Sequence, residues 1–137
     1  MSAWIGPNNG SGLSGPVGNY TYQTTFDLTG FNPSTASISG KWSSDNEGVG
    51  IWLNGTQIAG PTLDDQFSIL HGYVDFTATS GFISGLNTLE FKIYNRDSGS
   101  PTGLRVEMVG SVPDGGLTVA LLGMSLSGLA FFRRKLA

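Results

Sequence analysis

Aromatic residues outside the hydrophobic pattern are the first candidates for chemistry in this sequence, because exposed indole rings can stack on the faces of pyranose sugars. Trp52 lies between Ile51 and Leu53, so in an extended segment its ring points away from both aliphatic side chains. Trp4 stands beside a Gly/Asn-rich segment, where it could instead close one end of a fold. His71, the only histidine, could donate a hydrogen bond to a sugar or serve the structure. Trp52, His71 and Trp4 are therefore the candidate glycan-binding residues, each against a purely structural alternative.

Carboxylates gather in two short groups. Asp45, Asn46 and Glu47 could supply oxygen ligands to a structural Ca²⁺, although their spacing is not that of a defined calcium loop and solvated turn residues are the alternative. Asp64 with Asp65, or Asp45 with Glu47, could form a pair of the kind a glycosidase uses, but residues so close in sequence usually diverge on a strand or turn. Nucleophile-elbow, phosphate-loop and zinc-protease motifs do not occur. We therefore expect no enzymatic activity, with a glycan hydrolase as the weakest alternative.

Composition narrows the classes of function. A chain of 137 residues suits one domain, and 21 glycines with 12% charged residues favour short strands joined by tight turns. Residues 1–112 contain nine carboxylates and only four cations, which argues against nucleic-acid binding. The absence of cysteine excludes disulfides, a cysteine nucleophile and thiolate metal sites. The first ten residues have neither the cationic nor the apolar region of a signal peptide.

The elements that must position these residues read as strands. Four segments alternate one row of mostly apolar residues with a row of polar ones, as a half-buried strand does. The first rows are Tyr20, Tyr22, Phe26 and Leu28; Ala36, Ile38, Gly40 and Trp42; Leu89, Phe91 and Ile93; and Leu104, Val106 and Met108. Val49, Ile51 and Leu53 precede Asn54-Gly55, the strongest hairpin signal in the chain. Residues 43–48 read as a loop, 67–76 as an irregular strand or strand pair, and 3–5 as a short strand. Strands at intervals of 8–12 residues predict an all-β antiparallel sandwich or jelly roll over residues 1–111.

The last 26 residues form a segment of a different kind, 112–137. It begins with Val112, Pro113, Asp114, Gly115 and Gly116, continues with an apolar run over 117–132, and ends with Arg133, Arg134 and Lys135. The run of 16 residues predicts a single apolar helix slightly shorter than the roughly 17–25 residues that span a bilayer. The basic residues would remain cytoplasmic and leave the preceding domain outside. Pro113 and the two glycines do not continue a helix well, so this motif should be extended and accessible at the membrane surface.

This three-part order resembles the PEP-CTERM class of sorting signals, in its VPDGG-like variant. The resemblance implies an exported bacterial protein that is handled by an exosortase, an inner-membrane cysteine protease or transpeptidase, and delivered to the cell envelope or extracellular matrix. The segment from 1 to 111 resembles galactose-binding-like jelly rolls in "VGIWLNG", "SGFISGLNTLEFKIYN" and "SPTGLRVEMVGS". Members of that group usually carry a signal peptide and one or two strands before the segment "WIGP". A shortened or misassigned start, or another export route, would explain the difference, and missing strands would leave a sheet edge exposed.

Three hypotheses of function follow. The first is a non-enzymatic envelope or matrix protein whose sandwich binds polysaccharide. The second is a structural protein of biofilm, sheath or filament that associates with itself through sheet edges. The third is the hydrolase named above. Structural Ca²⁺ is the one cofactor the residues suggest, and the exosortase and the membrane are the partners that the sorting signal implies.

Overall fold

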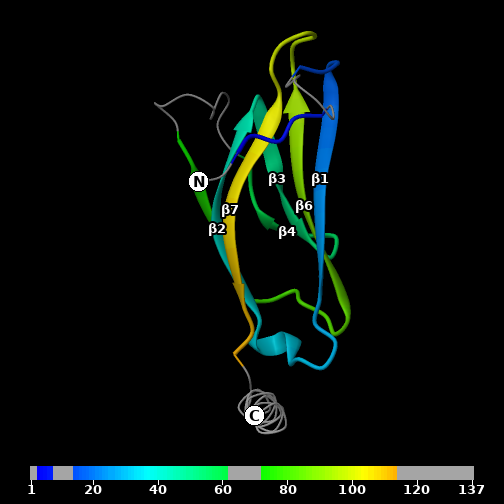
Figure 1. Cartoon of the computed structure of the whole chain (residues 1–137), viewed down its shortest axis with the longest axis vertical. Helices are drawn as coiled ribbons and strands as arrows, with labels where there is room; N and C mark the ends of the chain where they lie inside the picture. Colours follow the sequence, from blue (N-terminus) through cyan, green and yellow to red (C-terminus); the bar gives the residue numbers. More distant parts are fainter. Residues whose placement is uncertain (1–2, 8–13, 62–71, 114–137) are drawn as a thin grey trace, which may run out of the picture.

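The chain forms a β-sandwich, seen in a computed structural model that describes residues 3–7, 14–61 and 72–113 (Figure 1). The described elements are β1 (Gly18–Asp27), the 3₁₀ helix η1 (Pro33–Thr35), β2 (Ser37–Asp45), β3 (Glu47–Leu53), β4 (Thr56–Ala59), β5 (Val74–Ala78), β6 (Leu86–Asn95) and β7 (Gly103–Ser111). The prediction of an all-β antiparallel architecture is therefore confirmed.

Two antiparallel sheets make up the sandwich. One has four strands in the order β1-β6-β3-β4, and the other has three in the order β5-β2-β7. Strand β2 belongs to one sheet and β3 to the other, so the chain changes sheet between them. Ile5 forms an isolated antiparallel bridge with Leu104, in which each N–H donates to the other's carbonyl at 2.8 and 2.9 Å. The short strand predicted at 3–5 is thus reduced to a single bridge.

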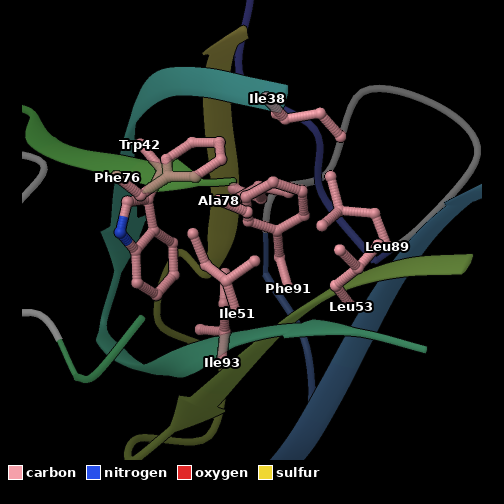
Figure 2. Close-up of a cluster of buried hydrophobic side chains, with 10 residues drawn as sticks. Ile38, Trp42, Ile51, Leu53, Phe76, Ala78, Leu89, Phe91 and Ile93 are labelled. Carbon is pink, nitrogen blue, oxygen red and sulfur yellow. The ribbon is translucent and has the colours of Figure 1, made fainter. Parts of the chain in front are cut away.

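The core lies between the sheets and is built from the predicted alternation (Figure 2). Leu89, Phe91 and Ile93 face inward from the central strand β6, as expected. Phe91 meets two rings of the opposite sheet, with centroids 5.9 Å from Trp42 and 5.8 Å from Phe76. Trp42 is fully buried, which confirms it as a core residue. The buried cluster comprises Ile38, Trp42, Ile51, Leu53, Phe76, Ala78, Leu89, Phe91, Ile93 and Leu104.

The Asn54-Gly55 hairpin is confirmed, with one departure in the strand before it. Asn54 and Gly55 both have positive φ, at 50° and 81°, as a type I′ turn requires. Ile51 and Leu53 are fully buried, but Val49 is only half-buried. The pairing of β3 with β6 shifts register between Gly48 and Gly50. A bulge therefore displaces Val49 from the inward row, which the alternation alone could not predict.

The expected loop at 43–48 is wrong. Strand β2 continues to Asp45 and β3 starts at Glu47, so Asn46 alone turns the chain from one sheet to the other. Ser43, Ser44 and Asn46 are buried at this corner. Polar residue types suggested a solvated loop, whereas here hydrogen bonds satisfy the buried groups: the Ser44 hydroxyl donates to the Asn46 carbonyl at 3.1 Å.

Candidate functional site

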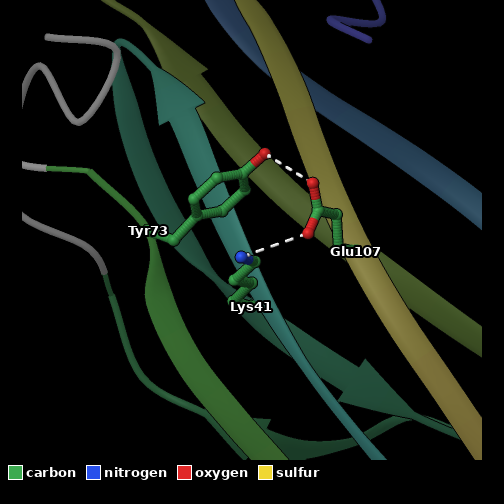
Figure 3. Close-up of polar contacts among 3 residues, drawn as sticks. All are labelled: Lys41, Tyr73 and Glu107. Carbon is green, nitrogen blue, oxygen red and sulfur yellow. Dashed lines mark hydrogen bonds and ion pairs between the residues drawn. The ribbon is translucent and has the colours of Figure 1, made fainter. Parts of the chain in front are cut away.

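A cluster of charged and aromatic side chains occupies the outer face of the three-stranded sheet (Figure 3). Lys41 on β2 lies directly opposite Glu107 on β7, and their Nζ and Oε2 atoms are 3.1 Å apart. The Tyr73 hydroxyl, from the residue before β5, donates to Glu107 Oε1 at 3.3 Å. The Tyr73 ring has Lys41 Nζ 4.7 Å and Arg105 Cζ 5.1 Å from its centroid. Strands β2 and β7 thus place both charge signs around one phenol ring.

An open groove of about 600 Å³ adjoins this cluster. Two hydroxyl residues, Ser39 and Thr77, and the carboxylate of Asp75 line it together with the Lys41–Glu107 pair. Gly40 keeps the strands close here, because a Cβ at this position would collide with the Glu107 carbonyl oxygen and lie 2.8 Å from Met108 Cβ. The full lining is Ser39, Gly40, Lys41, Asp75, Phe76, Thr77, Glu107, Met108 and Val109.

The side chains along the groove include both hydrogen-bond donors and acceptors. Ammonium and guanidinium groups donate, carboxylates accept, and hydroxyls do both, so adjacent sugar hydroxyls would find partners of each kind. The groove is open rather than enclosed, which leaves room for a polymer to continue beyond it. Sequence reasoning missed this cluster because Lys41, Tyr73 and Glu107 are over thirty residues apart, and only the strand order brings them together.

Trp52 lies on the outer face of the other sheet, as its phase predicted. It is half-buried and stands opposite Glu90 on β6. Lys92 Nζ lies 4.3 Å from the centroid of its ring and 3.4 Å from Glu90 Oε2. The indole also leans over Gly50, where an added Cβ would be 3.0 Å from its Cζ3 atom. Lys92 and the backbone at Gly50 therefore pack against the indole ring that is the candidate for stacking on a sugar.

The remaining predicted glycan-binding residues are not brought beside Trp52. Trp4 packs near Gly103 at the start of β7, where an added Cβ would lie 3.5 Å from Trp4 Cε3. It is therefore associated with the three-stranded sheet, whereas Trp52 belongs to the four-stranded one. His71 lies outside the described residues, two positions before Tyr73. Trp42, the other indole that could have formed a sugar-stacking platform with Trp52, is fully buried.

The predicted calcium ligands occupy the corner between β2 and β3. The Asn46 side chain is buried, and its Oδ1 accepts a hydrogen bond from the Arg96 backbone N–H at 3.3 Å. Within residues 3–7, 14–61 and 72–113, no group of three or more Asp, Glu or His side chains gathers as a metal site. The Asn46 amide therefore has a structural role here, and Ca²⁺ binding by Asp45, Asn46 and Glu47 stays an untested prediction. Asp64 and Asp65 lie outside the described residues.

Comparison with known proteins bears on the end of the chain. Residues 111–136 match the VPDSG-CTERM motif. The chain carries a PEP-CTERM-type sorting signal. Such a signal implies a secreted protein that is handled at the membrane and cell envelope, and processing by an exosortase-type enzyme. No curated protein and no solved structure matches the chain.

The VPDSG-CTERM segment starts where the sandwich ends. Its first matched residue, Ser111, is also the last residue of β7. The Thr35 hydroxyl donates to the Pro113 carbonyl at 3.2 Å, which ties the start of the signal to the segment containing η1. Both lie at the lower end of the sandwich in Figure 1. The sorting signal therefore leaves the domain from a defined place.

Most of the sorting signal lies beyond the part of the chain that the structure describes. Asp114, Gly115 and Gly116, the apolar helix predicted over 117–132, and the basic residues Arg133, Arg134 and Lys135 all fall outside it. Among the described residues, no helix has the length and apolar character needed to cross a membrane. The helix and its basic end thus remain predictions from the sequence.

Proposed function

We propose that this is a non-enzymatic protein of the cell envelope or extracellular matrix whose sandwich binds carbohydrate in the groove beside Lys41, Tyr73 and Glu107. The observation that carries the proposal is this cluster of fixed donors and acceptors, exposed along an open groove. A galactose-binding-like jelly roll, as the sequence resemblance implies, is the fold we assign to the sandwich. The sorting signal supports the proposal, because delivery to the envelope would bring the groove to polysaccharide.

The Lys41–Glu107 ion pair contributes little to the folding stability of the sandwich. The side chains of Lys41 and Glu107 are 43% and 38% exposed. An exposed ion pair of this kind contributes only about 0–1 kcal/mol to folding, because water and salt screen it. Both signs of charge are present around Tyr73, so the groove favours neutral sugars over strongly anionic or cationic polymers. A role in binding explains the arrangement better than a role in folding.

Glu107→Gln should weaken binding of the protein to its polysaccharide about tenfold or more, because a hydrogen bond to a charged group contributes roughly 1.5–3 kcal/mol. Tyr73→Phe should weaken it less, since it removes only the hydroxyl that holds Glu107. A glycan array followed by titration calorimetry on the best ligand measures both effects. Glu107 is exposed, so the folded structure should tolerate the change.

Trp52→Ala is the matched control on the opposite sheet. It should leave the affinity unchanged if the groove is the site. Loss of binding in Trp52→Ala but not in Glu107→Gln would show that the binding site is on the four-stranded sheet. If the unmodified protein retains no polysaccharide at all, carbohydrate binding is wrong.

The open edges of the sandwich favour a second candidate function, self-assembly. Among the described strands, β1 pairs only with β6, and β7 pairs with β2 and, at Leu104, with Ile5. A largely apolar groove of about 370 Å³ lies between these two edge strands, with Phe26 on one side and Met108 on the other. The inward residues Tyr20 and Tyr22 of β1 are only half-buried. This partial burial is still enough to raise the pKa of the Tyr22 hydroxyl. A strand from a second copy could pair with β7 and cover this groove.

Met108→Lys tests self-assembly, because it places an ammonium group in the groove. If the edge assembles, sedimentation velocity of the unmodified protein should show larger species as concentration rises, and Met108→Lys should stay monomeric. Val17→Lys provides a control at a hydrophobic residue of similar exposure, 49% against 44%, that does not line the groove. A monomer at all concentrations, or equal assembly by all three proteins, would contradict this candidate.

A further inference from the structure

One end of the sandwich consists of uncharged loops. Residues 28–36, 54–55 and 79–85 connect strands there, the last of them running into Leu86 at the start of β6, and Val112 with Pro113 leads out of β7. None of these residues is Asp, Glu, Lys or Arg. These four segments are called the uncharged end below. The opposite end differs, with Asp45 and Glu47 at the β2–β3 corner and Arg96 and Asp97 after β6.

Hydrogen bonds hold the segments of the uncharged end together. The Leu28 N–H donates to the Gly85 carbonyl at 2.8 Å, which joins residues 28–36 to 79–85. Asn54 Nδ2 donates to the Gly81 carbonyl at 2.9 Å, which adds the β3–β4 turn. The bond from Thr35 to Pro113 adds the start of the sorting signal. These contacts join the segments, and three of them, 28–36, 79–85 and 112–113, lie at the lower end of the sandwich in Figure 1.

Three large apolar side chains project from this surface into solvent. Phe31, Ile83 and Leu86 are 46%, 50% and 63% exposed. The segments that carry them are joined next to these residues, because the Leu28 N–H bonds to the Gly85 carbonyl beside Leu86. Apolar exposure at one end of a domain in this way is typical of an interaction site. The carboxylate that borders this end is Asp27, the exposed last residue of β1, which is paired opposite Leu86. Hydrogen bonds from Thr29 lower its pKa and hold it in the turn.

The loop that carries Ile83 and Leu86 is held firmly, so their exposure is part of the fold. Asn87 is fully buried, and its Nδ2 donates to the carbonyls of Ile83 and Gly85 at 2.8 Å each. Its Oδ1 accepts from the Ile83 N–H at 2.9 Å and from Asn54 Nδ2 at 2.8 Å. The buried amide therefore satisfies the loop backbone from inside, which leaves the two apolar side chains facing outward.

We infer that the uncharged end contacts the lipid bilayer, with Phe31, Ile83 and Leu86 inserted at its interface while the sorting signal is in the membrane. The position of the sorting signal indicates that the partner is the bilayer. Pro113, at the start of the signal, lies on this surface, and the signal implies handling at the membrane. Apolar side chains gain by leaving water at the interface, and loops without charges have no ionic groups to desolvate. The opposite, charged end then points away from the bilayer. This contact is independent of any sugar bound in the groove.

A pair of spin labels on the full chain in phosphatidylcholine/phosphatidylglycerol vesicles tests the inference. The chain has no native cysteine, so Ser84→Cys labels the uncharged end and Ser98→Cys, which is also exposed, labels the opposite end. The label at 84 should lose collisions with a water-soluble nickel complex and gain collisions with oxygen. The label at 98 should show the aqueous pattern. Equal aqueous accessibility at both positions would overturn the inference.

The effect of the side chains is separated from that of the sorting signal by adding Phe31→Ser, Ile83→Ser and Leu86→Ser to the Ser84→Cys chain. The protein should stay on the vesicles through its signal, while the label at 84 returns to aqueous accessibility. If the label stays shielded, the signal alone holds the domain near the bilayer and the inference fails. Leu86→Ser alone, at the most exposed position, gives the same readout should the triple variant lose its thermal unfolding transition.

Discussion

Phe91→Ala should lower the free energy of unfolding by about 3–5 kcal/mol. Phe91 is 3% exposed at the centre of β6. Its ring meets Trp42 of β2 and Phe76 of β5, so one side chain joins the four-stranded sheet to two strands of the other. Each aromatic contact adds roughly 0.5–1.5 kcal/mol beyond the buried area, and the truncation also leaves a cavity.

Urea denaturation of the full chain at neutral pH, followed by far-ultraviolet circular dichroism, measures the loss of stability. A small domain has only about 5–15 kcal/mol in total, so the variant should unfold at a much lower urea concentration. Phe31→Ala is the matched control, because it removes the same atoms from a ring that is 46% exposed, and it should change stability by less than about 1 kcal/mol. Equal losses in both variants would mean that the core is not centred on Phe91.

The strands that run through the interior were the predictable part of the fold. In the middle of β6, apolar residues alternate with Glu90 and Lys92, and the pattern alone assigned Leu89, Phe91 and Ile93 to the core. Asn54-Gly55 was equally clear, since positive φ at two successive positions has few sequence solutions. The corner at Asn46 was not predictable, because polar residues that satisfy one another in a buried turn have the same composition as a solvated loop. The bulge at Val49 depends on pairing with β6, which local sequence does not encode.

The candidate site was less predictable than the fold. Alternation placed Lys41 on the outer face of its strand, and the same argument placed Trp52 outside. The alternation does not determine which strands lie beside Lys41 and Trp52. The register of β2 with β7 brings Glu107 opposite Lys41, and the pairing of β5 with β2 brings Tyr73 alongside. These neighbours pack Lys92 against Trp52 and bring Lys41 to Tyr73, so the candidate site lies around Tyr73, which no single segment suggested.

Ending the chain after Pro113 should abolish membrane retention in an exporting host that has an exosortase-type enzyme. The complete chain should pass through a membrane-associated form, because its sorting signal contains the 16-residue apolar run 117–132 followed by Arg133, Arg134 and Lys135. The shortened chain keeps β7 and the bond between Thr35 and Pro113, so its sandwich should fold as before. Fractionation of cells after a pulse of synthesis, with an antibody to the sandwich, compares the two forms.

Two further chains show which part of the signal acts. Changing Arg133, Arg134 and Lys135 to Gln keeps the apolar run but removes the charges that should hold the end in the cytoplasm, so this chain should be retained less well. Changing Pro113 and Asp114 to Ala should leave membrane association intact and prevent processing, because the motif rather than the apolar run is what an exosortase-type enzyme would read. The unprocessed precursor should then accumulate in the membrane fraction. Equal membrane association of the complete chain and the chain ending at Pro113 would show that the sandwich itself provides the attachment, and would remove the anchoring role from residues 114–137.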